Sequence, residues 1–359
     1  MSRRYVQKVL SWAHSFFPGS RLVVVGDQCG WVLDEEARSL QALLEKAGAV
    51  VTVSAFPWKR QAAFFESRQT ALANIRQWTE QGIVVTFPYY HGFPLRGNAE
   101  FDKFYGLLQK HHNQIARVQV THAAMRDCLL EAGIDSGKIR TIYIGINSQT
   151  FRIPDQSMRD AVRQRLGVPR SAAVIGSFQK DGEGWGEGDC PKLIKGPDVF
   201  IKALAILKES VPDLHVLLSG PARGYVKRGL AAAGIPYNET GFISYGDIPF
   251  LYHAIDAYLV ASREEGGPKA ILESMASGVP IISTRVGQAT ELIRHGENGW
   301  LADISDSEAL AAFTLKSLSD SSWRTQAILN ARQTAEMNDY AAQTAAWTDF
   351  FQGLVSFAK

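Results

Sequence analysis

The chain has 359 residues, 46% of them apolar and 21% charged, which predicts two domains because one hydrophobic core rarely organises so long a chain. Its 31 glycines and 14 prolines are spread along the sequence, which argues against a fibrous or disordered protein. The net charge is only +2, although residues 1–150 carry 17 Lys and Arg against 12 Asp and Glu. This excess fits an anionic partner or ordinary variation, and we expect no nucleic-acid partner.

The cysteine content and hydropathy favour a cytoplasmic protein. Cys29, Cys128 and Cys190 are odd in number and far apart, so a disulfide framework is not expected. No run approaches the roughly 20 apolar residues of a spanning helix, and we expect no signal peptide. Residues 4–17 have the pattern of an amphipathic helix, which would either pack on the first sheet or lie on a membrane. Peripheral association with the inner membrane face therefore stays open.

Short β-branched runs alternate with helix-length stretches along the chain. The expected strands are residues 21–26, 50–54, 83–87, 139–144, 173–176, 214–219, 257–261 and 280–284, and the expected helices include 34–47, 69–81, 101–110 and 197–209. Near-continuous apolar strands are typical of parallel sheets covered on both faces, so the pattern predicts an α/β protein with two doubly wound, Rossmann-like sheets.

A polar stretch with a proline, residues 151–164, is the expected seam between the two domains. It gives domains at 1–150 and 151–340. The apolar run at about 341–359 is expected to form a helix that packs back on the first domain.

The stretch Glu264–Pro280, EEGGPKAILESMASGVP, has the pattern of a helix start that binds an anion. Pro268 suits a first helical turn, where no amide donor is needed, and two glycines before it leave the backbone open. The free amides of such a turn attract a diphosphate. Glu273 would lie roughly 7–8 Å along the helix, within reach of an attached ribose, and Glu265 would face a sugar. The alternative is that both glutamates are ordinary surface residues.

A second expected helix start, at Lys195, Gly196 and Pro197, has the same pattern of a glycine before a proline. A cation beside a helix N-terminus is unfavourable unless an anion is also present. Lys195 and Lys180 could therefore hold the diphosphate and neutralise a leaving group, or both could be solvated lysines.

These residues resemble the retaining glycosyltransferases of family four, the glycosyl transferases group 1 set with the GT-B fold. The resemblance covers most of residues 115–355 and is most specific at ASREEGGPKAILESMASGVPIISTRVGQATELIRHGENGWLAD, which contains the family's E-x7-E spacing. It implies transfer of a sugar from a nucleotide-sugar, with retained anomeric configuration and no metal or cofactor. The first domain would bind a carbohydrate or lipid-linked acceptor and the second the donor, in glycoconjugate or polysaccharide biosynthesis.

The resemblance also implies roles for individual residues. The catalytic group would be Glu265, Lys195 and His91; the donor-binding group would be Glu273, Lys180, Gly266, Gly267, Lys269, Ala270, Phe242, Ile243 and Gly30. His91 follows an expected strand, and a structural loop histidine is its alternative. His122 is expected to be structural.

The sequence departs from the family pattern in two places. An acidic, glycine-rich loop, DGEGWGEGD at Asp181–Asp189, separates Lys180 from Lys195, where the family often has Arg-x4-Lys. We expect a flexible surface loop there, with a lid over the donor as the alternative. The first domain has GDQCGW after its leading strand, so Gly30 is only a weak match to the family's glycine loop.

Other enzyme classes fit less well. The chain lacks a dinucleotide fingerprint, a Walker loop, zinc spacing and any Asp-x-Asp motif. Two alternatives remain open: an epimerase or phosphorylase on the same fold, and a non-catalytic protein that binds sugar nucleotides.

Overall fold

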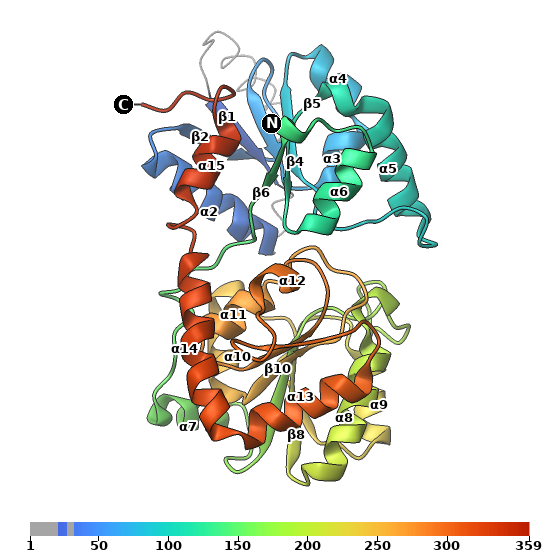
Figure 1. The fold of residues 1–359 in the computed structure, drawn as a ribbon, viewed down its shortest axis with the longest axis vertical. Helices are drawn as coiled ribbons and strands as arrows, with labels where there is room; N and C mark the ends of the chain where they lie inside the picture. The colour runs from blue at the N-terminus through green and yellow to red at the C-terminus, as the bar shows by residue number, and fades with distance from the viewer. Residues whose placement is uncertain (1–20, 27–31, 359) are drawn as a thin grey trace, which may run out of the picture. The chain divides into compact units, whose positions relative to one another are not determined.

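The computed structural model describes residues 21–26 and 32–358. The amphipathic pattern at 4–17 and Gly30 therefore lie outside the described residues. The chain forms two compact units: unit 1 runs to Tyr143 and resumes at Tyr340, and unit 2 is Ile144–Asp339 (Figure 1). Among the described residues, no helix is both long and apolar enough to cross a membrane.

Unit 1 is built on a six-stranded parallel sheet with the order β2-β1-β3-β4-β5-β6. Its strands are β1 (Arg21–Val25), β2 (Val50–Ser54), β3 (Ala62–Phe65), β4 (Val84–Pro88), β5 (Ile115–Val120) and β6 (Ile139–Thr141). Its helices are α2 (Val32–Lys46), α3 (Arg68–Ala73), α4 (Ile75–Glu80), α5 (Ala99–His111), α6 (Ala123–Glu131) and α15 (Thr344–Phe351).

Both faces of this sheet are buried. Alternate residues of each strand point to opposite sides of the sheet, and the two sets belong to two different buried clusters. On β1, Val23 and Val25 join one apolar cluster, whereas Leu22 and Val24 join the other. The second cluster contains apolar residues of α2 and α15, so a helix from the end of the chain completes the core of unit 1.

Aromatic packing fixes α15 in that core. The ring of Phe64 on β3 lies 5.5 Å from that of Trp347, 5.9 Å from that of Phe350 and 6.0 Å from that of Phe351, each with edge-on geometry. Edge-on pairs at these separations are favourable beyond the area they bury.

Unit 2 holds a second six-stranded parallel sheet with the order β12-β11-β10-β7-β8-β9. Its strands are β7 (Ala173–Phe178), β8 (Leu214–Ser219), β9 (Tyr237–Glu239), β10 (Ala257–Val260), β11 (Ile281–Thr284) and β12 (Trp300–Ala302). Its helices are α7 (Gln156–Arg165), α8 (Pro197–Ser210), α9 (Gly224–Ala232), α10 (Ile248–Ala254), α11 (Ala270–Ala276), α12 (Ala289–Leu292), α13 (Ser307–Ser319) and α14 (Ser321–Met337).

The predicted fold class is confirmed: each unit is a doubly wound α/β layer structure. Strands β3, β5, β9 and β12 were not among the expected strands. The expected helix 69–81 is two helices, because Asn74 leaves the helical conformation between them with φ −123°.

The expected seam at 151–164 lies within unit 2. Its polar residues belong to α7, whose N-cap Asp155 accepts a 2.8 Å hydrogen bond from the Met158 amide, and the units divide earlier, between Tyr143 and Ile144. An aspartate at this position satisfies one of the free amides of the first turn.

The packing of α15 gives a first prediction. Replacing the fully buried Phe350 by Ala should lower the free energy of unfolding of unit 1 by about 3–5 kcal/mol, because a large cavity replaces the ring. The exposed Phe56, also in unit 1, is the matched control: Phe56→Ala should change it by less than about 1 kcal/mol. Urea unfolding monitors both variants, and equal effects would contradict this account of the core.

Candidate functional site

The strand order of unit 2 reverses between β7 and β10. From β7 the chain proceeds to β8 and β9 on one side, and then to β10, β11 and β12 on the other. In open parallel sheets, ligands bind in the crevice at the carboxyl ends of the strands at such a reversal. A ligand site is therefore expected in the segments that follow β7 and β10.

Two loops meet there and are joined by their backbones. The carbonyl of Ile194, in the loop before α8, accepts hydrogen bonds from the amides of Arg263 at 2.8 Å and Glu264 at 3.1 Å, in the loop after β10. Arg263 also donates to both oxygens of Asp198, at 2.8 and 2.6 Å. Such a two-bond guanidinium–carboxylate pair fixes both distance and orientation.

Gly196 allows this close approach. Its φ is +62°, and a Cβ at this position would overlap the carbonyl oxygen of Ala261. Only glycine combines the left-handed backbone with so little space.

The junction brings together the two residues predicted to act on the leaving group and the sugar. The Lys195 ammonium forms an ion pair with Glu265 Oε1, and their side chains are 23% and 13% exposed. The same oxygen accepts a 3.1 Å hydrogen bond from Ser262 Oγ. A partly buried pair of opposite charges is thus placed in the segments that follow β7 and β10.

Glu273 lies on the helix that follows this loop. Its carboxylate is buried, with Oε1 accepting from Tyr245 OH at 2.8 Å and Oε2 accepting from Tyr252 OH at 2.9 Å. Helix α11 begins at Ala270, not at Pro268 as predicted, because Pro268 and Lys269 form a preceding turn.

Neither tyrosine was among the predicted site residues. Burial raises the pKa of Tyr252 well above its ordinary value, and the Glu273 carboxylate raises it further. The Tyr252 hydroxyl therefore keeps its proton and donates a hydrogen bond to Glu273 at any physiological pH.

The loop between the two glutamates is held by the segment that follows β11. Gly287 has φ +47°, and a Cβ there would overlap the carbonyl oxygen of Gly266. The next amide, of Gln288, donates to that carbonyl at 2.9 Å. Gly267 is similarly crowded, since its Cβ would lie 2.5 Å from Ile144 Cδ1.

The segment after β9 borders Glu273 through Tyr245. Lys269 places its ammonium 4.4 Å from the centre of the Tyr245 ring, a cation–π distance. In the same segment Phe242 is exposed and Ile243 is partly exposed, as a surface for a planar ring requires.

Lys180 is not part of the Lys195–Glu265 junction. Its ammonium lies 4.0 Å from the centre of the Trp185 ring, at the tip of the glycine-rich loop.

The glycine-rich loop at Asp181–Asp189 is not the loosely held segment that we expected. Glycines of the loop contact the chain after β8 so closely that a Cβ at Gly182 or Gly188 would overlap the carbonyl oxygen of Ala222.

Backbone hydrogen bonds hold the same loop, from Gly224 to the Glu187 carbonyl at 2.6 Å and from Tyr225 to the Gly188 carbonyl at 2.9 Å. Trp185 nevertheless remains 67% exposed.

A buried ion pair closes the base of this loop. Arg223, fully buried, lies 3.1 Å from Asp181 and donates to the carbonyls of Ser177, Gln179 and Ser219. Burial raises the pKa of Asp181, and the Arg223 charge lowers it. Arg223 thereby ties the ends of β7 and β8 to the start of the loop.

His91 lies in unit 1, after β4. Its carbonyl oxygen accepts a hydrogen bond from the guanidinium of Arg68, and its ring lies edge-on to Phe101 with centres 5.5 Å apart. His122 Nδ1 lies 3.1 Å from Thr121 Oγ1 at the start of α6.

Residues 192–334 match the model of the family described as glycosyl transferases group 1. The second unit belongs to this family. Its E-x7-E glutamates are Glu265 and Glu273, so the resemblance predicted from the sequence is confirmed.

Curated relatives of this chain include the D-inositol 3-phosphate glycosyltransferase of Corynebacterium urealyticum. That protein is 28% identical over 64% of this chain and 53% of its own length. The O-antigen chain mannosyltransferase B of Escherichia coli is 29% identical over 59% of each chain. The chain thus spans between half and three fifths of the length of these two relatives.

Solved structures share the fold over most of the chain. HepE of Anabaena, in complex with UDP-glucose, has a TM-score of 0.74 at 19% identity and covers 93% of this chain and 100% of its own. Sucrose-phosphate synthase of Thermosynechococcus elongatus has a TM-score of 0.72 at 15% identity, covering 93% and 99%. This likeness shows the predicted GT-B fold.

The crowding at Gly287 gives a second prediction. Gly287→Ala should lower the stability of the protein by more than the about 1–2 kcal/mol that a left-handed alanine costs, because the Gly266 loop must also shift. Gly234 is the matched control, with φ +63° and no atom within 4 Å of a Cβ. Thermal unfolding compares the two variants, and equal losses would show that the contact with Gly266 is unimportant.

Proposed function

We propose that the protein is a retaining, hexosyltransferase-type glycosyltransferase that moves a sugar from a nucleotide-diphosphate sugar to a hydroxyl group of an acceptor. The observation that carries this proposal is the junction of Lys195 and Glu265 at the strand-order reversal of a group 1 domain, with Glu273 eight residues further on. Positive charge and a carboxylate side by side suit a substrate that joins a diphosphate to a polyhydroxylated ring.

Lys195 would act on the leaving group. In this structure its charge is neutralised by Glu265, and an incoming diphosphate would compete for the same ammonium. Lys195 would then stabilise the negative charge that develops as the bond to the sugar breaks. Glu265 would accept hydrogen bonds from the sugar, and the backbone amides of Gly266–Ala270 would donate hydrogen bonds to the diphosphate. Lys195 supplies a positive charge that a metal ion supplies in other enzymes, so we propose metal-independent transfer.

Glu273 would hold the ribose of the donor. A carboxylate can accept hydrogen bonds from both hydroxyls of a vicinal diol. Tyr252 is fully buried and Tyr245 is only partly buried. We therefore propose that ribose replaces the Tyr245 hydroxyl at Oε1 while Tyr252 keeps its hydrogen bond to Oε2. The base would then lie over Phe242 and Ile243.

Transfer with retained configuration needs no enzyme nucleophile if the leaving phosphate assists the attacking hydroxyl on the same face of the sugar. Catalysis then rests on positioning and charge stabilisation. His91 remains a proposed contributor from unit 1, and Gly30 a proposed part of its glycine loop. Lys180 would contribute only if its ammonium leaves the Trp185 ring.

Relatives support a role in glycan biosynthesis. Two of them are named for transfer to D-inositol 3-phosphate and to O-antigen chains, and HepE was solved with UDP and UDP-glucose. We accordingly propose a UDP- or GDP-sugar donor and a carbohydrate or lipid-linked acceptor. The proposed location is the cytoplasm, with peripheral contact at the inner membrane face.

A panel of donors and acceptors tests this function. UDP-, GDP- and ADP-sugars are first ranked by thermal stabilisation, and the best donor is then incubated with candidate acceptors in the presence of EDTA. Acceptor-dependent release of nucleotide and an NMR coupling that shows the donor's anomeric configuration in the product would support the proposal. Isomerised donor without release would indicate an epimerase, phosphate-dependent release a phosphorylase, and binding without turnover a silent binding protein.

Lys195→Ala should reduce turnover at least about tenfold, which corresponds to about 1.4 kcal/mol of lost transition-state stabilisation. Lys202, exposed on α8 of the same unit, is the control, and Lys202→Ala should keep the wild-type rate. Initial rates at saturating donor compare the two variants. A wild-type rate in Lys195→Ala would remove this residue from the mechanism.

Glu273→Ala should weaken binding of the nucleoside diphosphate by about 1–3 kcal/mol through loss of a charged hydrogen bond. Tyr245→Phe should weaken it far less, because ribose replaces the hydroxyl that this variant lacks. Titration calorimetry measures both. Equal losses in the two variants would indicate that Tyr245 itself contacts the nucleotide, and unchanged affinity in Glu273→Ala would refute the ribose role.

A further inference from the structure

A second charged hollow lies at the opposite end of the strands that carry the donor site. It has a volume of about 330 Å³ and lies beside Ala172 and Ala173, where β7 begins, and Asp256, directly before β10. Lys195 and Glu265, in contrast, follow the carboxyl ends of the same strands. The two sites are thus separated by the length of the sheet.

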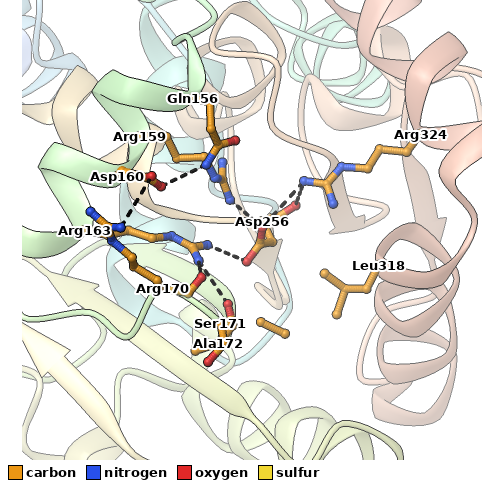
Figure 2. Close-up of a pocket in the computed structure, with 11 residues that line it drawn as sticks. Gln156, Arg159, Asp160, Arg163, Arg170, Ser171, Ala172, Asp256, Leu318 and Arg324 are labelled. Carbon is orange, nitrogen blue, oxygen red and sulfur yellow. Dashed lines mark hydrogen bonds and ion pairs between the residues drawn. The ribbon is translucent and has the colours of Figure 1, made fainter.

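Four arginines line this hollow, Arg159, Arg163, Arg170 and Arg324, and they face only two carboxylates, Asp160 and Asp256 (Figure 2). The lining therefore carries a formal charge of +2. Arginine keeps its charge in proteins, so burial cannot remove the excess by deprotonation.

Both carboxylate oxygens of Asp256 have partners without Arg170 and Arg324. Its Oδ1 pairs with Arg159, and its Oδ2 accepts from Arg163 at 2.7 Å and from the Val174 amide at 2.8 Å. Arg163 also donates to the carbonyls of Ala254 and Ala172. Arg159 and Arg163 therefore hold α7 to the sheet, which is a structural role.

Arg324 and Arg170 are not needed for that role. Arg324 forms a longer ion pair with Asp256, with Nη2 3.7 Å from Oδ1, and the same nitrogen donates a 3.3 Å hydrogen bond to the Asp256 carbonyl. Arg170 is 68% exposed and lies 4.0 Å from Asp160. Figure 2 shows Arg324 across the hollow from Arg159 and Arg163, with Asp256 between them.

The like charges in this hollow act on the pKa of Arg159, which is lowered. Burial lowers the pKa of Arg159; Asp256 raises it, and Arg163 and Arg324 lower it. A bound anion would offset this repulsion.

We propose that this hollow is a binding site for a small phosphorylated anion, held by Arg324 and Arg170 and distinct from the donor site. Guanidinium groups suit a phosphate because two parallel N–H donors match two of its oxygens. The pocket has the volume of a small-ligand site. Its place at the amino ends of the strands separates its occupant from the sugar donor.

Inorganic phosphate is the probe, titrated by calorimetry into protein with the Lys195→Ala change, which weakens any competing phosphate site at the donor end. In this background Arg324→Gln and Arg170→Gln should each weaken phosphate binding at least about tenfold. Arg324→Lys, which keeps the charge, should lose less. Arg294→Gln is the matched control, because Arg294 is ion-paired in unit 2 and its 51% exposure lies between those of Arg324, 28%, and Arg170, 68%, but it lies outside this hollow.

Each outcome decides the proposal. Melting temperatures in chloride at matched ionic strength report whether a variant is folded, and the exposed Arg170 gives a second variant that the fold does not depend on. Equal phosphate affinity in Arg324→Gln, Arg170→Gln and Arg294→Gln would overturn the proposal. Loss of phosphate binding through Lys195→Ala alone would also overturn it, because the anion would then bind only at the donor end.

Discussion

The contact between the loop before α8 and the loop after β10 determines the geometry of the candidate site. These loops follow adjacent parallel strands, so the sheet brings them to one edge, but their register depends on the Ile194 carbonyl and the Arg263–Asp198 pair. Gly196 permits the approach by having no side chain. Lys195 and Glu265 then meet without a direct covalent or helical link, since 70 residues separate them.

The local part of this site could be predicted from the sequence. A proline after two glycines, glutamates eight residues apart and a Lys-Gly-Pro helix start are short-range signals. They pointed to Glu265, Glu273 and Lys195, of which the structure brings Lys195 and Glu265 into contact. The parallel sheets could also be predicted from the sequence, because buried parallel strands are nearly continuous apolar runs. Short strands such as β9 and β12 carry too few residues for such a run, which explains why they were not expected.

Other parts of the site depend on tertiary contacts that no short pattern contains. Tyr245 and Tyr252 reach Glu273 from a segment more than twenty residues earlier. The glycines of the loop after Lys180 suggested a flexible surface loop, yet Gly182 and Gly188 are packed against Ala222. In these cases glycine serves close backbone packing, and sequence alone does not separate that use from flexibility.

The return of the chain end to unit 1 has a topological consequence. The polypeptide passes between the units twice, at Tyr143–Ile144 and at Asp339–Tyr340, and hydrogen bonds join the two passages from Ile146 to Asn338 and from Gln343 to Tyr143. A single proteolytic cut in either passage therefore gives two fragments that each hold part of unit 1, and the packing of α15 on the sheet would hold them together. A fragment that stops at Tyr143 would also expose the apolar surface around Phe64 that α15 covers, so the first unit cannot be isolated intact as one contiguous stretch of sequence.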